Sequence, residues 1–186
     1  IEGDTPAAYV ATSPSGHVPE AERMTQLMIG AAHRRIWIAN SYFIPSAAVS
    51  DMLIEKAKAG VDVRVLAPGK KMDMKPVRAG QLSVYDRLLE GGVRIWEYEP
   101  AMMHAKTMLV DDHLVMVGST NLDVLSRMDL EEGTFVIEDI TMAKELESHL
   151  EADFTHSLEI RWSWWRKRGI ADRLAPALSP LIGRFL

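Results

Sequence analysis

The sequence predicts an α/β fold with a mixed, largely parallel sheet and helices on both faces. Short runs of apolar and β-branched residues alternate along the chain with segments whose apolar residues recur at spacings of three and four, which is how strands alternate with helices. A length of 186 residues with 47% apolar and 25% charged residues is enough for one domain with a sizeable core.

The first half of the chain predicts three strands and two helices. A short apolar run indicates a strand at 7–12, and apolar residues spaced three and four apart indicate a helix at 19–32. A buried strand is expected at 36–43. A helix follows at 46–59, with a serine at its start as cap and a glycine after its end, and β-branched residues indicate a strand at 61–66.

The second half continues the alternation. A helix at 78–90 is closed by two glycines, and the next strand is expected at 93–98. Two short apolar runs joined by a polar turn indicate a hairpin at 108–117. A strand at 132–137 and a long helix with an apolar stripe at 142–154 complete the body.

Composition excludes several classes of protein. The chain has no cysteine, so a disulfide framework and a thiolate zinc site are both excluded. The six histidines show no metal-ligand spacing, and we expect neither a metal nor a cofactor. No apolar run approaches the roughly 20 residues that cross a bilayer. The first residue is Ile1, which suggests a processed chain or a piece of a longer one.

Charge is distributed unevenly along the chain. The net charge is -5, yet the segment from Glu159 onward carries six basic and two acidic residues. The rest of the chain is therefore strongly acidic. Because contacts to phosphates dominate nonspecific binding of nucleic acids, an acidic body makes nucleic acid an unlikely partner.

The expected hairpin carries polar residues at both of its ends. Side chains alternate along a strand, so His104 and Lys106 are expected on the same side, about 7 Å apart. Asp111 has the opposite parity and is expected on the other face or in the turn, which makes it a poor direct partner for the imidazole. The second strand leads into Gly118-Ser119-Thr120-Asn121.

The spacing of these residues is similar to the signature of the phospholipase D superfamily: His-x-Lys, four residues, Asp, six residues, Gly-Ser-x-Asn. Six specified positions within 18 residues match it. Three further segments, at 36–45, 60–66 and 118–123, resemble the second half of bacterial cardiolipin synthases. The resemblance extends from about residue 10 to about residue 168.

The resemblance implies a chemistry for the matched residues. His104 would attack phosphorus and form a phosphohistidine, while Lys106, Asn121 and Ser119 would donate to the nonbridging oxygens. Gly118 is expected beside the substrate. Asp111 belongs to the motif, but we expect it to orient or support the site. The superfamily uses one such motif in each of two halves, and this chain has one.

Glu132 lies where the superfamily keeps an acidic residue that fixes the tautomer of a motif histidine. The alternative is a solvated glutamate beside Glu131 at the start of a strand. The sequence there departs from the usual Asn-x-Glu pattern, so the register could differ by one residue.

Two lysines follow the expected strand at 61–66. Ligands of open α/β sheets tend to bind at the carboxyl ends of strands, so Lys70 and Lys71 could hold a lipid phosphate. A charged surface loop is the alternative interpretation.

The end of the chain differs from the body, and we divide the sequence into a phospholipase D-like half-domain at 1–160 and a tail at 161–186. Three tryptophans lie among four basic residues at 161–168, followed by an apolar segment. Tryptophan favours the membrane interface and clustered cations favour anionic headgroups, so the tail predicts a membrane-surface element. The alternative is a segment that packs on another part of the protein.

Together these features predict a phospholipase D-type phosphatidyltransferase of the cardiolipin synthase kind that acts on phospholipid. We expect it to be peripheral to a bacterial cytoplasmic membrane, or else cytoplasmic. With water as the acceptor the same chemistry would give a phospholipase D. One alternative is a homodimeric nuclease of the same superfamily. Another is a half-domain that supports a separate catalytic half. In each case a second motif-bearing half, or a second copy, is the expected partner.

Overall fold

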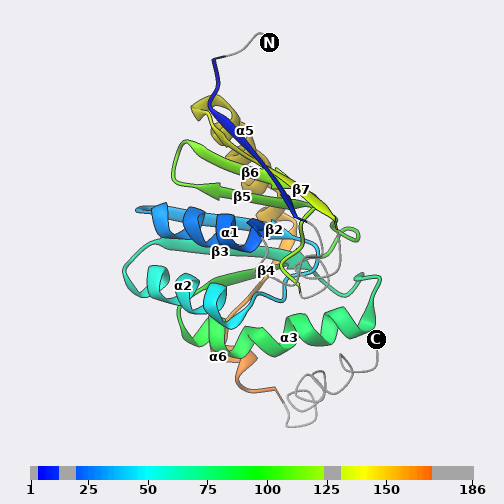
Figure 1. Ribbon diagram of the computed structural model, residues 1–186. Coiled ribbons are helices and arrows are strands. Elements are labelled where there is room, and N and C mark those ends of the chain that lie inside the picture. Colours follow the sequence, from blue (N-terminus) through cyan, green and yellow to red (C-terminus); the bar gives the residue numbers. More distant parts are fainter. Residues whose placement is uncertain (1–3, 13–19, 124–130, 169–186) are drawn as a thin grey trace.

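A computed structural model describes residues 4–12, 20–123 and 131–168 of the chain. Its centre is an eight-stranded sheet with the order β1-β7-β6-β5-β2-β3-β4-β8 (Figure 1). The strands are β1 (Ala7–Thr12), β2 (Arg35–Asn40), β3 (Asp62–Pro68), β4 (Arg94–Tyr98), β5 (Lys106–Val110), β6 (Leu114–Gly118), β7 (Glu132–Glu138) and β8 (Ser157–Ile160).

The predicted mixed α/β sheet is confirmed, but its parallel part is smaller than expected. Only β2, β3 and β4 are parallel neighbours. The other five strand pairs of the described sheet are antiparallel. The reason is the connections: helical crossovers link β2, β3 and β4, whereas β5 and β6 form a hairpin, which reverses the chain.

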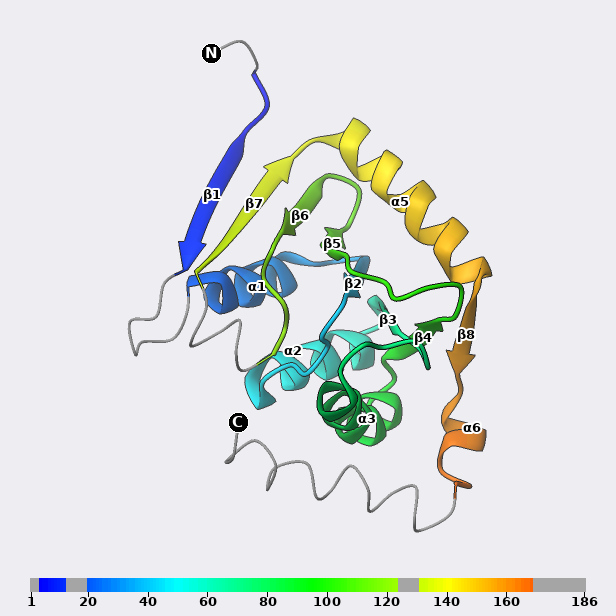
Figure 2. The ribbon, with the colours of Figure 1, turned by 90° about the vertical axis from the view of Figure 1, so that its right-hand side faces the viewer.

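Helices cover both faces of the sheet, as predicted (Figure 2). One face carries α1 (Glu20–Ala31), α2 (Ala47–Lys58) and α3 (Lys75–Glu90), whose apolar residues share one core cluster with alternate residues of the strands. The other face carries α5 (Ile140–Thr155), which contributes Ala143 and Leu150 to a second cluster.

The alternation of β2 explains how two clusters form from one sheet. Ile36 and Ile38 point to the face of α1 and α2, while Trp37 and Ala39 point to the face of α5. All four side chains are buried, because a central strand is covered on both sides. The continuous apolar run in the sequence therefore marks the middle of the sheet.

The chain after α5 forms two short elements that the sequence analysis did not predict: β8 and α6 (Trp162–Trp165). β8 pairs with β4 and is itself an edge strand of the sheet. Trp165 is buried, its ring centroid lies 5.2 Å from that of Tyr85 on α3, and its indole nitrogen donates to Asp86. The first part of the predicted tail is thus packed on α3, and residues 169–186 lie outside the described part of the chain.

No helix in the described part of the chain has the length and apolar character needed to cross a membrane.

Candidate active site

All the motif residues except Asp111 gather at one end of the sheet, where β2 and β6 finish and β5 and β7 begin. The strand register brings them there: Lys106 pairs with Asn40, and Gly118 pairs with Thr134. The loop after β3, which holds Lys70 and Lys71, leaves the sheet at the same end, because β3 is parallel to β2. We call this end of the sheet the carboxyl end of β2.

His104 lies in the loop just before β5, and its side chain is exposed. Its ring is perpendicular to that of Tyr42, with the centroids 6.2 Å apart, which is an edge-to-face contact. The Tyr42 hydroxyl donates to the carboxylate of Asp73, at 3.1 Å from one oxygen and 3.2 Å from the other. The imidazole is therefore supported on one side and accessible to a substrate.

Lys106 is the first residue of β5, and its ammonium donates to the backbone oxygen of His104 at 3.1 Å. Burial lowers the pKa of Lys106 below its ordinary value, while the carboxylates of Glu132, Asp123 and Asp73 act in the opposite direction. The ammonium thus lies close to the backbone of His104 and is acted on by the charges of three carboxylates.

Asn121 is buried in the loop after β6 and contacts the segment after β2. Its Oδ1 accepts a hydrogen bond of 2.6 Å from the hydroxyl of Ser41, which is fully buried. The backbone amide of Ser41 in turn donates to the carbonyl of Ala105, at 3.0 Å, next to His104. Ser41 therefore contacts both parts of the motif, the His104 loop and the loop that holds Asn121.

Ser119 and Gly118 hold the end of β6 close to β7. The backbone amide of Ser119 donates to the carbonyl of Gly133 at 2.9 Å, and its hydroxyl accepts from the Gly133 amide at 3.1 Å. A side chain on Gly118 would overlap the Gly133 carbonyl and come within 2.7 Å of Thr134 Cα. The close approach of β7 explains why this position holds a glycine, and the substrate contact expected for Gly118 stays a prediction.

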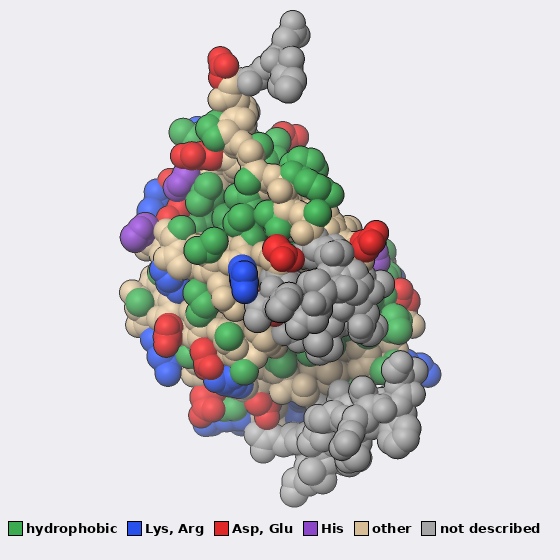
Figure 3. Space-filling view, viewed as in Figure 1, with side chains coloured by type: hydrophobic (Ala, Val, Ile, Leu, Met, Phe, Trp, Pro, Cys, Tyr) green, Lys and Arg blue, Asp and Glu red, His purple; other side chains and the backbone are tan. Residues whose placement is uncertain are grey.

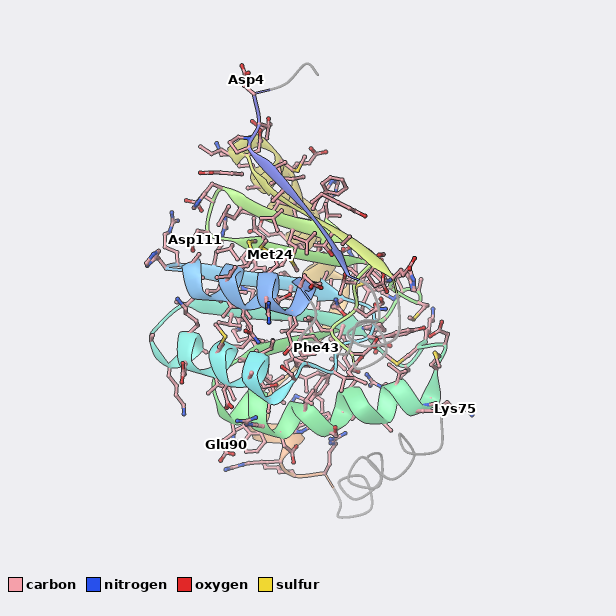
Figure 4. All side chains as sticks on the ribbon, in the orientation of Figure 1. Asp4, Met24, Phe43, Lys75, Glu90 and Asp111 are labelled. Atoms are coloured by element: carbon pink, nitrogen blue, oxygen red, sulfur yellow. The ribbon has the colours of Figure 1, made fainter. Side chains whose placement is uncertain are left out.

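Asp111 lies at the opposite end of β5 from the histidine. Its carboxylate accepts hydrogen bonds from the backbone amides of His33, Arg34 and Arg35, at 2.8–3.3 Å. Figure 4 labels Asp111 at one end of the sheet and Lys75, just after the Lys70–Lys71 loop, at the other. The orienting or structural role expected for Asp111 agrees with this position, and its grouping with the catalytic side chains is corrected.

The pKa of Asp111 follows from these contacts. Burial by itself raises its pKa, but the backbone donors of Arg35, Arg34 and His33 outweigh burial, so the pKa lies below its ordinary value. The carboxylate therefore stays charged and ties the turn after β5 to the start of β2.

Glu132 is the first residue of β7 and lies at the carboxyl end of β2. Its charge acts on Lys106, favouring the protonated ammonium. Its predicted role as partner of a motif histidine stays a prediction.

The two lysines after β3 have different surroundings. Lys71 donates to the carbonyl of Pro100 at 2.7 Å, which links the β3–α3 loop to the loop that carries His104. Lys70 is exposed at the same end of the sheet. Their phosphate-binding role stays a prediction. Arg78, which follows them, pairs at 2.6 Å with the buried Glu97 and supports the packing of α3 on β4.

The sequence analysis assigned no role to the polar residues at the end of β2 and just after it. Asn40, Ser41 and Tyr42 contact the loop after β6, Asn121 and His104 respectively. A signal for them was present: three polar residues in a row end a buried strand at the end of the sheet where ligands of α/β folds bind.

The arrangement suits attack on an anionic centre. An exposed imidazole can act as a nucleophile, and an ammonium and an amide can stabilise negative charge next to it. Among residues 4–12, 20–123 and 131–168, no three histidine, aspartate or glutamate side chains are grouped closely enough to hold a metal ion.

A family model and the relatives found by sequence comparison point to the same family. The family described as "Cardiolipin synthase, PLD-like domain" matches residues 26–154. Cardiolipin synthase 1 of Bacillus cereus is 36% identical over 177 residues, which cover 95% of this chain and 35% of that protein. Cardiolipin synthase A of Pseudomonas aeruginosa is 38% identical over 160 residues, covering 83% of this chain and 32% of that protein. The chain thus spans about a third of the length of these relatives.

Two solved structures share the fold. The phospholipase D family member Nuc from Salmonella typhimurium has a TM-score of 0.72 at 18% identity, covering 85% of this chain and 99% of that one. The phosphatidylserine synthase of Haemophilus influenzae has a TM-score of 0.68 at 14% identity, covering 95% of this chain and 46% of that one.

Proposed function

This chain belongs to the family of cardiolipin synthase, PLD-like domains, and we propose that it supplies half of the active site of a phosphatidyltransferase that acts on phospholipid phosphodiesters. The observation that carries the proposal is the convergence of an exposed His104 with Lys106 and Asn121 at the carboxyl end of β2. The proposal places the protein in phospholipid biosynthesis.

The proposed reaction has two displacements at phosphorus. A ring nitrogen of His104 forms a bond to phosphorus, the ester bond to the leaving alcohol breaks, and a second histidine protonates that alcohol. The hydroxyl of a second lipid then attacks the phosphohistidine, gives its proton to the second histidine and restores the His104 ring. Attack by water would release phosphatidic acid instead.

The neighbouring side chains lower the barrier by stabilising charge. The nonbridging oxygens gain negative charge as the nucleophile approaches, and the Lys106 ammonium and the Asn121 amide are donors at that end of the sheet. The Ser119 hydroxyl, which donates to the Gly133 carbonyl over a long 3.5 Å, would turn its proton to the phosphate and add a third donor. Lys70 would meet the phosphate of an incoming lipid from the loop after β3.

The second histidine would come from a second motif-bearing half. The chain contains one motif and spans about a third of its relatives' length. We therefore expect the chain alone to be either a symmetric dimer, with two His104 rings facing each other, or nearly inactive. Size-exclusion chromatography with light scattering measures the first alternative directly.

The experiment that tests the function compares lipid with DNA as substrate. Phosphatidylglycerol vesicles and, separately, plasmid DNA are incubated with the unaltered protein and with the His104→Ala variant. If the chain needs a second motif-bearing half for activity, both are prepared as the complete active protein. His149→Ala is the matched control, since His149 is exposed on α5. We expect cardiolipin formation that His104→Ala abolishes and His149→Ala retains. DNA cleavage that depends on His104, with no lipid turnover, would refute the lipid assignment.

The charge pattern favours lipid over nucleic acid. On the face shown in Figure 3, described basic and acidic side chains are interspersed, whereas a nucleic-acid surface gathers lysine and arginine in a patch or stripe. The bacterial origin of the relatives supports a bacterial source, and the proposed substrate supports a place at the cytoplasmic membrane surface.

A further inference from the structure

The amide of Asn121 has two ends with opposite effects on a phosphate. Its nitrogen donates hydrogen bonds and would stabilise a nonbridging oxygen, whereas its oxygen is an acceptor and would repel one. A rotation of the amide by half a turn exchanges the two. The site therefore needs a contact that distinguishes the ends.

Ser41 supplies that contact. Its hydroxyl donates to Asn121 Oδ1 at 2.6 Å, and its side chain is fully buried. The acceptor end of the amide is thus occupied from the side of β2, so the nitrogen is directed away from Ser41.

Other groups hold the backbone around Asn121. The side-chain oxygen of Asn40 accepts from the backbone amide of Leu122 at 3.1 Å. The backbone amide of Ile44 donates to the carbonyl of Leu122 at 2.7 Å. Because these contacts do not involve the Ser41 hydroxyl, its removal leaves them in place and takes away the hydrogen bond to Asn121 Oδ1.

We propose that Ser41 is a positioning residue, whose hydroxyl fixes the amide of Asn121 so that its N–H groups face the phosphoryl oxygens. The proposal rests on the proposed function, because it assumes that a phosphoryl group binds beside Asn121. Ser41 itself does not touch the substrate.

The test measures binding of orthovanadate, a phosphate mimic, to the whole chain by isothermal titration calorimetry. The variants are Ser41→Ala, Asn121→Ala and the double variant, and Ser50→Ala is the control, since Ser50 is a buried serine on α2. We expect Ser41→Ala to weaken binding about three- to tenfold, the effect of one hydrogen bond. Ser50→Ala should bind as the unaltered protein does.

The double variant separates positioning from a general structural role. If Ser41 acts through Asn121, its removal has no further effect once Asn121 is alanine, whereas independent damage would multiply the two losses. The side-chain amide of Asn121, observed by ¹⁵N NMR, should shift with orthovanadate in the unaltered protein and shift less in Ser41→Ala. Ser41→Cys, with a weaker donor of similar size, should be intermediate and serves as the second variant if Ser41→Ala unfolds.

The outcomes distinguish failure of the positioning role of Ser41 from failure of the proposed function. Loss of binding in Asn121→Ala but not in Ser41→Ala, or a double variant with multiplied losses, would overturn the positioning role alone. Unchanged binding in Asn121→Ala would contradict the proposed function as well.

Discussion

At the scale of single residues, Asp111 shows that a motif position can serve the fold. The residue is 7% exposed, and its carboxylate accepts from three consecutive backbone amides, so it satisfies groups that would otherwise be unpaired at the start of β2. The residue has a positive φ of 51°, a conformation that Asn also adopts readily. Asp111→Asn therefore changes the charge with little backbone strain.

We expect Asp111→Asn to lower the free energy of unfolding by about 2–3 kcal/mol, since hydrogen bonds to a charged group are stronger than those to a neutral one. Urea denaturation measures the loss. Asp112→Asn is the control, because Asp112 contacts the guanidinium groups of Arg34 and Arg35 rather than the backbone. An equal loss in both variants would contradict the assigned role.

The same carboxylate predicts a dependence of stability on pH. Because the pKa of Asp111 is lower in the folded than in the unfolded chain, its contribution is complete above the ordinary pKa of about 3.9 and is lost as the pH falls through the lower value. The difference in stability between the unaltered protein and Asp111→Asn should therefore shrink on acidification. A constant difference between pH 6 and pH 3 would contradict it.

Lys106 predicts a dependence of activity on pH. Burial lowers its pKa, and its charge is lost as the pH rises through that lowered value, so activity should fall at a pH below the ordinary lysine range of about 10.4. Lys106→Arg should move this alkaline limb to higher pH, because a guanidinium stays protonated. The measurement is kcat against pH in the active protein. Lys58→Arg, at an exposed lysine on α2, should leave the limb in place.

At the scale of elements, the sequence predicted the buried strands and helices well because their apolar patterns are strong. The burial of β2 and the capping serine of α2 both appear as expected. The predicted strand at 36–43 instead ends at Asn40, because Asn40 Oδ1 accepts from the Tyr42 amide and turns the chain. β8 was missed, since a four-residue edge strand has too few residues to show a period.

The packing of β6 against β7 predicts that a side chain at Gly118 destabilises the fold. A Cβ there would meet the backbone of β7, which cannot move away without breaking the ladder, so Gly118→Ala should cost about 1–3 kcal/mol of stability. Gly30, in α1, has nothing within 4 Å of an added Cβ. Gly30→Ala should therefore stabilise the chain by about 0.5–1 kcal/mol. Thermal unfolding of both variants measures the contrast, and a neutral Gly118→Ala would show that β6 and β7 separate easily.

At the scale of the whole molecule, the candidate site was predicted in part because its residues are close in sequence. His104, Lys106, Ser119 and Asn121 belong to one hairpin and its flanks, so their spacing was visible in the motif. Ser41 contacts Asn121, 80 positions further along the chain, and Tyr42 contacts His104, 62 positions further along. Without the order of the strands, nothing in the sequence places β2 beside β5.

The fold also changes how a membrane role for the carboxyl-terminal tail must be tested. A chain that ends at Glu159 lacks Ile160 and Trp165, which are both buried in the core beside β4 and α3, so it should unfold more readily than the complete chain. Weaker vesicle binding by such a chain would report lost folding as well as lost contacts. A cut after Arg168 keeps these residues.

We expect the chain 1–168 to sediment less than the complete chain with vesicles that contain anionic lipid, at a temperature at which both chains are folded. The apolar segment 174–186 is removed, while the exposed Trp164 and the basic residues beside it remain. Vesicles of neutral lipid are the control, since they lack the charge that attracts Arg166 and Lys167. Equal sedimentation of both chains with anionic vesicles would assign no membrane contact to the last 18 residues.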